Sequence, residues 1–164
     1  MSDNTIFVKA EQLGRLLRGR NETIATAESC TGGLLAGAIT DIPGSSAWFG
    51  MGLVTYSNDA KMQLLGVDQA TLDSHGAVSE PVVCMMAAGI QSKAKANWSA
   101  AISGIAGPEG GTALKPVGTV WFAFCRPDGS VWTVCRCFAG DRAAVRRQSV
   151  DLALSELITA CEGA

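Results

Sequence analysis

Two serines and a lysine in one short stretch are the residues best suited to chemistry. The stretch, residues 43–61, reads PGSSAWFGMGLVTYSNDAK. A serine hydroxyl becomes a nucleophile when a base removes its proton, and a lysine kept neutral by burial can be that base. We therefore consider Ser45 or Ser46 as the nucleophile and Lys61 as the base. The alternative is a simple turn and a solvated lysine, since the spacing alone does not bring these side chains together.

Lys61 is expected at the edge of a core. A predicted strand that ends at Tyr56 precedes it, and Leu64 and Leu65 follow it within a helical pattern. The only histidine, His75, lies in a predicted connector, so a Ser-His-Asp triad is the weaker hypothesis.

Metal-binding side chains are scattered along the chain. The six cysteines lack C-x-x-C spacing and are expected to be reduced thiols in the core. Metal-dependent phosphoester hydrolysis normally needs clustered carboxylates. The acidic residues considered for that role are dispersed: Asp41, Asp59, Glu80 and Glu109. We expect no metal and no other cofactor.

A glycine-rich segment, Glu28–Gly33, follows the first predicted strand and precedes a helix. Ligands of α/β proteins lie at such strand ends, where helix N-termini favour anions. Thr31 and Gly32 are therefore candidates to bind a phosphate. The alternative is that Thr31 caps the helix and the glycines serve packing.

A second glycine-rich segment, Gly104–Gly111, follows a later predicted strand. Its first residues could bring backbone N–H groups close to a ligand, and an ordinary loop is the alternative. The candidates are Gly104, Ile105 and Ala106.

Two arginines, Arg142 and Arg146, lie one turn apart at the start of the last predicted helix, after Asp141 as its N-cap. Cations are unfavourable at a helix N-terminus unless an anion or a carboxylate compensates them. This pair is therefore a candidate to bind a phosphate or carboxylate.

Hydrophobic patterning predicts five strands interleaved with helices. They are residues 23–27, 48–56 and 98–103 and the hairpin segments GTVWFAFC and VWTVCRCF on either side of RPDGS. Early βα units followed by a hairpin predict an α/β fold, a three-layer α/β/α sandwich around a mixed five-stranded sheet. At 164 residues the chain is expected to form a single domain, residues 1–164.

Composition narrows the class of partner. The chain is 48% hydrophobic and 17% charged, with a formal net charge of −2. This charge provides no general attraction for nucleic acid or anionic membranes, so a small-molecule partner is expected. The chain has neither a signal-peptide pattern nor a long apolar span, and a cytoplasmic location is expected. The oligomeric state, including a homo-oligomer, stays open.

Seven motifs together resemble the C-terminal domain of the CinA family in its stand-alone form. They are TAESCTGG, DIPGSSAWF, VTYSNDAK, GAVSEPVV, SGIAGPEGG, KPVGTVWFAF and FAGDRAAVRRQSV, in the order of the family and over nearly the whole chain. Larger family members carry an additional N-terminal domain, and its activity is not transferred to this chain. The family fold is likewise a three-layer sandwich around a mixed five-stranded sheet.

The resemblance implies that the chain hydrolyses the carboxamide of nicotinamide mononucleotide in pyridine-nucleotide recycling, with a serine, a lysine and no metal. Carried onto this sequence, these residues are Ser46 and Lys61, with Tyr56 completing the catalytic group. Arg142 would bind an anionic part of the substrate, and backbone groups at Ser45 or at 104–106 would hold the oxyanion. A nucleotide-binding or adaptor domain without catalysis is the alternative function.

Overall fold

A mixed sheet forms the centre of the molecule, and the computed structural model describes residues 3–164. Its strands are β1 (Ile24–Glu28), β2 (Phe49–Val54), β3 (Trp98–Gly104), β4 (Thr119–Cys125) and β5 (Val131–Cys137). They lie in the order β2-β1-β3-β4-β5. Strand β1 is parallel to both of its neighbours, whereas β4 is antiparallel to β3 and to β5. The predicted mixed five-stranded sheet is confirmed.

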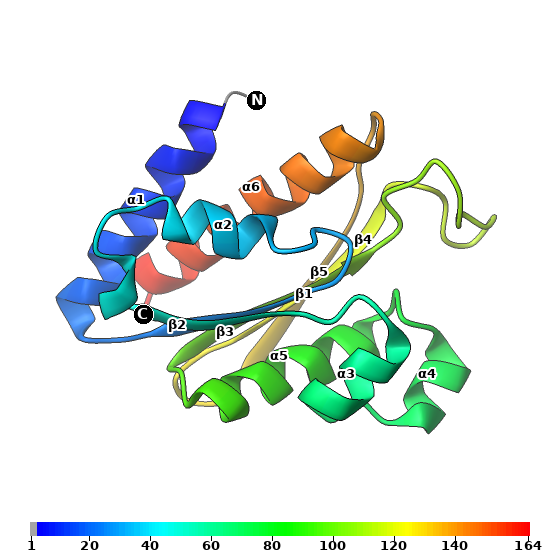
Figure 1. The fold of residues 1–164 in the computed structure, drawn as a ribbon, viewed down its shortest axis with the longest axis horizontal. Coiled ribbons are helices and arrows are strands. Elements are labelled where there is room, and N and C mark those ends of the chain that lie inside the picture. Colours follow the sequence, from blue (N-terminus) through cyan, green and yellow to red (C-terminus); the bar gives the residue numbers. More distant parts are fainter. Residues whose placement is uncertain (1–2) are drawn as a thin grey trace.

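Helices cover both faces of this sheet (Figure 1). One face carries α1 (Asp3–Arg20), α2 (Leu34–Thr40) and α6 (Arg142–Glu162). The other carries α3 (Asn58–Leu65), α4 (Gln69–His75) and α5 (Glu80–Ala94). The buried apolar residues form two clusters, one on each side of the sheet. The predicted three-layer sandwich is therefore confirmed. Within residues 3–164, no helix has the length and apolar character needed to cross a membrane.

Strand β1 is buried along its whole length, and its side chains alternate between the two clusters. Ile24 belongs to the cluster under α1, α2 and α6, whereas Ala25 and Ala27 belong to the cluster under α5. Because alternate strand residues face opposite sides, Glu28 faces α2 and Ser29 faces the layer that contains α3 and α5. The end of β1 therefore sends two polar side chains to opposite faces of the sheet.

Two local predictions differ from the structure. The expected connector before His75 contains a helix, α4, which begins after Asp68, whose carboxylate accepts a hydrogen bond from Thr71 N at 2.6 Å. The N-cap of α2 is Gly33 and not Thr31. Gly33 has φ 99°, a left-handed conformation that glycine adopts readily.

All six cysteines are free thiols. Cys30, Cys125 and Cys161 are buried as predicted, and Cys84 is half-buried. The prediction of a core position is wrong for two of them. These two, Cys135 and Cys137, are exposed because β5 is an edge strand.

Helix α5 packs closely against the end of α3, the helix that carries Lys61, and this packing can be tested by substitution. A Cβ on Gly89 would lie 2.1 Å from the backbone oxygen of Leu65. Gly89→Ala should therefore lower the free energy of unfolding by about 1–3 kcal/mol in denaturant titrations. Gly19→Ala is the matched control in α1, because no atom lies within 4 Å of its added Cβ. Equal stability of both variants would contradict this packing.

Candidate active site

The candidate site lies where the parallel strands β1, β2 and β3 end. The chain leaves β1 toward α2 on one face and leaves β2 toward α3 on the other (Figure 1). Diverging connections of this kind open a crevice at the carboxyl edge of an α/β sheet. A cavity of about 230 Å³ occupies this edge. It is lined by Ser29, Cys30, Tyr56, Asn58, Lys61, Ala77, Val78, Ser103, Gly104, Ala106 and Arg142.

Strand pairing continues past β1 and fixes the backbone of Ser29. Ser29 N donates to Ile102 O at 2.9 Å, and Thr55 N donates to Glu28 O at 2.9 Å. Ser29 therefore lies between the extensions of β2 and β3. Its neighbour in the cavity, Ser103, is also buried and donates from its hydroxyl to Ala77 O at 2.8 Å.

The Lys61 side chain is buried, with 1% of the residue's surface exposed. It lies one turn into α3, which begins after Ser57, whose hydroxyl accepts from Ala60 N at 3.1 Å. Its Nζ lies 3.1 Å from Ser29 Oγ, 2.8 Å from Thr55 O and 3.4 Å from the backbone oxygen of Tyr56. The expected burial of Lys61 is therefore observed, and its serine partner is Ser29.

Burial lowers the pKa of Lys61 below its ordinary value of 10.5. A neutral amine offers two N–H donors and one lone pair. Nζ donates to the Ser29 hydroxyl oxygen and to the two backbone carbonyls around it. In the uncharged form, the contact with Ser29 Oγ at 3.1 Å can instead use the Nζ lone pair to accept the hydroxyl hydrogen.

The structure does not bring Ser45 and Ser46 to Lys61. They belong to the short helix η1 (Ser45–Ala47), which precedes β2, whereas Lys61 follows β2. Trp48 directly follows η1, and its backbone oxygen accepts a hydrogen bond from Ile24 N, at the start of β1, at 2.9 Å. A strand as long as β2 spans roughly 20 Å, so the two serines lie at the opposite edge of the sheet. The expected pairing of Ser46 with Lys61 is corrected to Ser29 with Lys61.

Tyr56 and Arg142 meet at the mouth of the cavity. Arg142 Nη2 donates to the Tyr56 hydroxyl at 2.9 Å, and Arg142 Nη1 donates to Gly107 O at 2.8 Å. Tyr56 contacts Lys61 through its backbone oxygen, and the residue as a whole is 60% exposed. The Tyr56 hydroxyl therefore bonds Arg142 and not Lys61. Arg142 keeps further guanidinium donors for a ligand.

The predicted phosphate site at the start of α2 is occupied by the protein itself. Glu28 accepts from Leu35 N at 2.9 Å and from Ala36 N at 3.0 Å, so a carboxylate already satisfies these backbone donors. Thr31 is fully buried, and neither Thr31 nor Gly32 lines the cavity. An anion at this helix start would be opposed by the charge of Glu28.

The second glycine-rich segment reaches the cavity in part. Gly104 and Ala106 line it, whereas Ile105 does not. Ile105 instead continues the pairing of β3 with β4, because its N–H donates to Thr119 O at 2.8 Å. The site residues that the sequence identified and that the cavity brings together are thus Tyr56, Lys61, Gly104, Ala106 and Arg142.

Cys30 is the other potential nucleophile in the cavity. Burial raises the pKa of its thiol to about 11, so the thiol is protonated at neutral pH and only weakly nucleophilic. Of the hydroxyl and thiol groups in the cavity, Ser29 Oγ is the one bonded to Lys61 Nζ. Among residues 3–164, no group of three or more His, Cys, Asp or Glu side chains could hold a metal ion.

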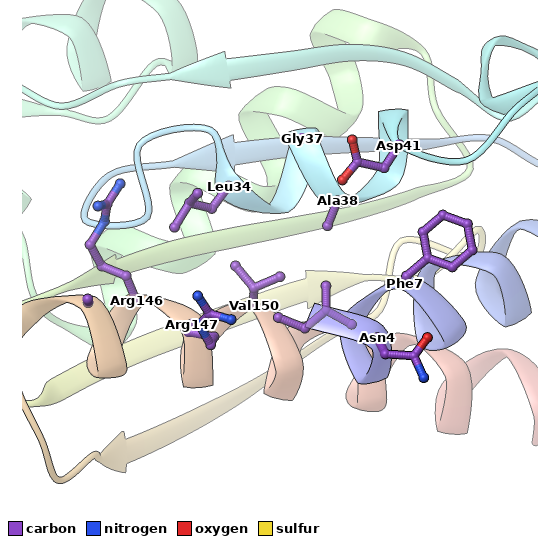
Figure 2. A pocket seen from close by; sticks show the side chains of 11 residues that line it. Asn4, Phe7, Leu34, Gly37, Ala38, Asp41, Arg146, Arg147 and Val150 are labelled. Atoms are coloured by element: carbon purple, nitrogen blue, oxygen red, sulfur yellow. The ribbon is translucent and has the colours of Figure 1, made fainter. Parts of the chain in front are cut away.

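A larger cavity of about 740 Å³ lies between α1, α2 and α6 (Figure 2). Phe7 of α1, Leu34 of α2 and Val150 of α6 contribute apolar surface to it. Neither Ser29 nor Lys61 lines this groove. Arg146 stands at one end of it and turns toward the loop that precedes α2. The predicted anion-binding pair is therefore divided, because Arg142 faces the small cavity and Arg146 faces this loop.

The fold and the site define an α/β domain with a buried serine–lysine pair at the carboxyl edge of a mixed sheet. Residues 7–161 match the family model described as the CinA C-terminal domain. The chain therefore belongs to the CinA family, as its motifs indicated.

The curated relatives include short proteins of similar length. The chain is 56% identical over 157 residues to a protein of Escherichia coli strain K12 named "Nicotinamide-nucleotide amidohydrolase PncC". This alignment covers 96% of the chain and 95% of the relative. A Pseudomonas putida protein of the same name is 53% identical, with 93% of the chain and 95% of the relative covered. A "CinA-like protein" of Mycolicibacterium gilvum is 52% identical over 93% of the chain but only 36% of the relative.

Solved structures share this fold. A CinA superfamily protein from Klebsiella pneumoniae has a TM-score of 0.93 and 40% identity, with 97% of this chain and 99% of the other covered. A competence/damage inducible protein from Agrobacterium tumefaciens has a TM-score of 0.92 and 42% identity, with 97% and 96% covered.

Proposed function

We propose that this chain is an amidohydrolase that converts nicotinamide mononucleotide to nicotinic acid mononucleotide and ammonia, with Ser29 as nucleophile and Lys61 as base. The single observation that carries the mechanism is the 3.1 Å contact between Lys61 Nζ and Ser29 Oγ inside a cavity. The substrate is supported by relatives that bear this activity in their names and match over nearly their whole length. The reaction would serve pyridine-nucleotide recycling in the cytoplasm.

The first step is acylation of Ser29. The neutral Lys61 amine takes the hydroxyl proton while the oxygen attacks the carboxamide carbon, which forms a tetrahedral intermediate and an ammonium on Lys61. Lys61 then gives this proton to the carboxamide nitrogen. The C–N bond breaks, ammonia leaves, and the nicotinoyl group stays on Ser29 as an ester.

The second step is hydrolysis of this ester. Lys61, neutral again after ammonia has left, takes a proton from a water molecule that attacks the ester carbon. The proton returns to Ser29 Oγ as the C–O bond breaks, and the carboxylic acid product releases its own proton to solvent to become the carboxylate. Both steps use the same amine as base and then as acid, which requires no other titrating group.

The negative charge of each intermediate needs donors on the other side of the reacting carbon. Cys30 lines the cavity directly after Ser29, and Gly104 and Ala106 line it from the end of β3. We assign the oxyanion to backbone N–H groups of these segments. One donor of this kind is typically worth about 2.7–4 kcal/mol of transition-state stabilisation.

Arg142 is the group proposed to bind the phosphate. It lines the cavity mouth and is already oriented by its bonds to Tyr56 and Gly107. A guanidinium pre-positioned in this way binds a phosphate through charge-assisted hydrogen bonds. The exposed ring of Tyr56 lies beside it and would contact the ribose or the base.

Arg142→Met should lower kcat/KM for nicotinamide mononucleotide by about 10–100-fold, because a charge-assisted hydrogen bond is lost. Initial rates of ammonia release measure this effect. The phosphate-free nucleoside should be a poor substrate of the natural protein and should lose less than about threefold on the same substitution. Free nicotinamide should also be a very poor substrate. Equal losses on the nucleotide and the nucleoside would contradict phosphate recognition by Arg142.

The competing function is a nucleotide-binding or adaptor domain without catalysis. Ammonia release from nicotinamide mononucleotide, measured with and without a chelator, separates the two. The proposed amidase releases ammonia at the same rate in both conditions. Tight binding of the nucleotide without ammonia release would favour the adaptor function.

A further inference from the structure

We propose that Glu28 and Arg146 are positioning residues, which hold the loop that follows Ser29 from its two sides and so aim the Ser29 hydroxyl. The kinetic part of this inference rests on the proposed amidase function. Its structural part does not, because it concerns the order of residues 29–33. Neither side chain lines the cavity, so neither is a catalytic residue.

Glu28 ties the end of β1 to the start of α2. Its side chain is 1% exposed, and its two oxygens accept from Leu35 N at 2.9 Å and from Ala36 N at 3.0 Å. These amides belong to the first turn of α2, which has no partner for them within the helix. Both ends of the intervening loop are therefore fixed by one buried side chain.

Arg146 holds the same loop from α6. Its Nε donates to Cys30 O at 3.0 Å, and its Nη2 donates to Thr31 O at 3.2 Å. The neighbouring residues Val145 and Val150 are buried in the core, which anchors this part of α6. Figure 2 shows the side chain rising from α6 toward the loop before α2. One planar guanidinium thus fixes two successive carbonyl groups directly after Ser29.

The loop needs such external support because its own bonds are few. Within it, Gly32 N donates to Ser29 O at 3.0 Å. Gly32 has φ 58° and Gly33 has φ 99°, conformations that glycine leaves readily in the absence of restraints. Carbonyls of successive residues repel each other when they point the same way, and the cation of Arg146 compensates this repulsion. Leu34 N also donates to Thr31 O at 3.1 Å, so the loss of Arg146 would mainly release the Cys30 carbonyl.

These restraints on the loop determine the orientation of the Ser29 hydroxyl. Its hydroxyl must stay within hydrogen-bond reach of Lys61 Nζ and in line with the substrate carbon. A displacement of the reacting group by about 1 Å can lower the rate roughly 100-fold. Because the positioning residues do not touch the substrate or Lys61, substitution should lower kcat and leave KM and the pH midpoint of the reaction unchanged.

The test compares Arg146→Lys and Glu28→Gln with Arg147→Lys, a matched control at the next position of α6. Arg146→Lys keeps the charge but cannot reach two carbonyls in one plane, and Glu28→Gln keeps the shape but replaces one acceptor by a donor. We expect kcat for nicotinamide mononucleotide to fall by about 10–100-fold in both variants. KM should change less than about threefold, and Arg147→Lys should match the natural protein.

A second measurement is independent of the substrate. Amide hydrogen exchange of residues 29–34 should accelerate at least about tenfold in both variants and stay unchanged in Arg147→Lys. In the same two variants, a fluorophosphonate should label Ser29 more slowly than in the natural protein. Glu28→Gln and Arg146→Lys enzymes with natural kcat and natural exchange would overturn the inference, even if Ser29→Ala is inactive and the amidase function stands. If the natural protein releases no ammonia, the proposed function fails, and the exchange and labelling rates alone decide the positioning role.

Discussion

Ser29→Ala should lower the rate of ammonia release from nicotinamide mononucleotide by at least about 1,000-fold, because it removes the cavity hydroxyl that contacts Lys61 Nζ. Lys61 would lose its hydroxyl partner, and the pKa of Cys30 is too high for that thiol to replace Ser29 at neutral pH. Nucleotide binding, measured by calorimetry, should remain nearly intact. Steady-state ammonia release measures the loss.

Ser46→Ala and Ser45→Ala are the matched controls for this experiment. Both residues lie in η1 at the opposite edge of the sheet, so both variants should keep activity within about threefold of the natural protein. An inactive Ser46→Ala enzyme beside an active Ser29→Ala enzyme would overturn the assignment of the nucleophile.

Replacing Lys61 should have an effect of similar size for a different reason. Lys61→Met removes the base, and Lys61→Arg retains a cation that is not deprotonated at neutral pH. Both variants should lose at least about 1,000-fold in kcat, as enzymes do when a nucleophile loses its activating base. A fully active Lys61→Arg enzyme would exclude proton transfer to this residue.

The pH dependence follows from the direction of the Lys61 pKa shift. Burial lowers the pKa, and only the neutral amine can accept the Ser29 proton, so kcat/KM should rise with pH through the lowered pKa of folded Lys61. At lower pH the amine is protonated and activity is lost. A rate of ammonia release that falls as pH rises through neutrality would contradict a neutral base.

The same shift links stability to pH. Between the lowered pKa of folded Lys61 and its ordinary value of 10.5, the unfolded chain binds a proton that the folded chain does not. The free energy of unfolding should therefore rise with pH in this window, by at most about 1.4 kcal/mol per pH unit from this group. Lys61→Met should lack this slope, and identical pH slopes in both proteins would contradict the shift.

Lys61 could be identified from sequence because its surroundings are local. A strand ends just before it, and leucines follow it in the same helix, so burial of its amine follows from the neighbouring residues. The fold could be predicted for the same reason, since strand patterns, the Asp-Gly hairpin and the glycine turns are all local signals. Among the α-helices of residues 3–164 only α4 was missed, because it is seven residues long and buries a single side chain, Leu72. The short 3-10 helix η1 was also not predicted.

The nucleophile could not be chosen from spacing, because Ser29 and Lys61 are 32 residues apart in sequence and meet through strand pairing. A signal was nevertheless present. Ser29 directly follows a predicted strand, whereas Ser46 precedes one, and ligands of parallel sheets lie at carboxyl ends. The loss of Thr31 as an anion ligand has a similar origin. Sequence could not indicate that the carboxylate of Glu28 turns back onto the amides of α2.

The central claim is that uncharged Lys61 makes Ser29 the residue that carries the acyl group. Acid quenching during turnover of nicotinamide mononucleotide, followed by mass spectrometry of the peptides, identifies that residue. We predict the nucleotide acyl adduct on the peptide that contains Ser29, and no adduct in Lys61→Met. An adduct on the peptide that contains Ser46, or on Ser29 at natural levels in Lys61→Met, would contradict the account.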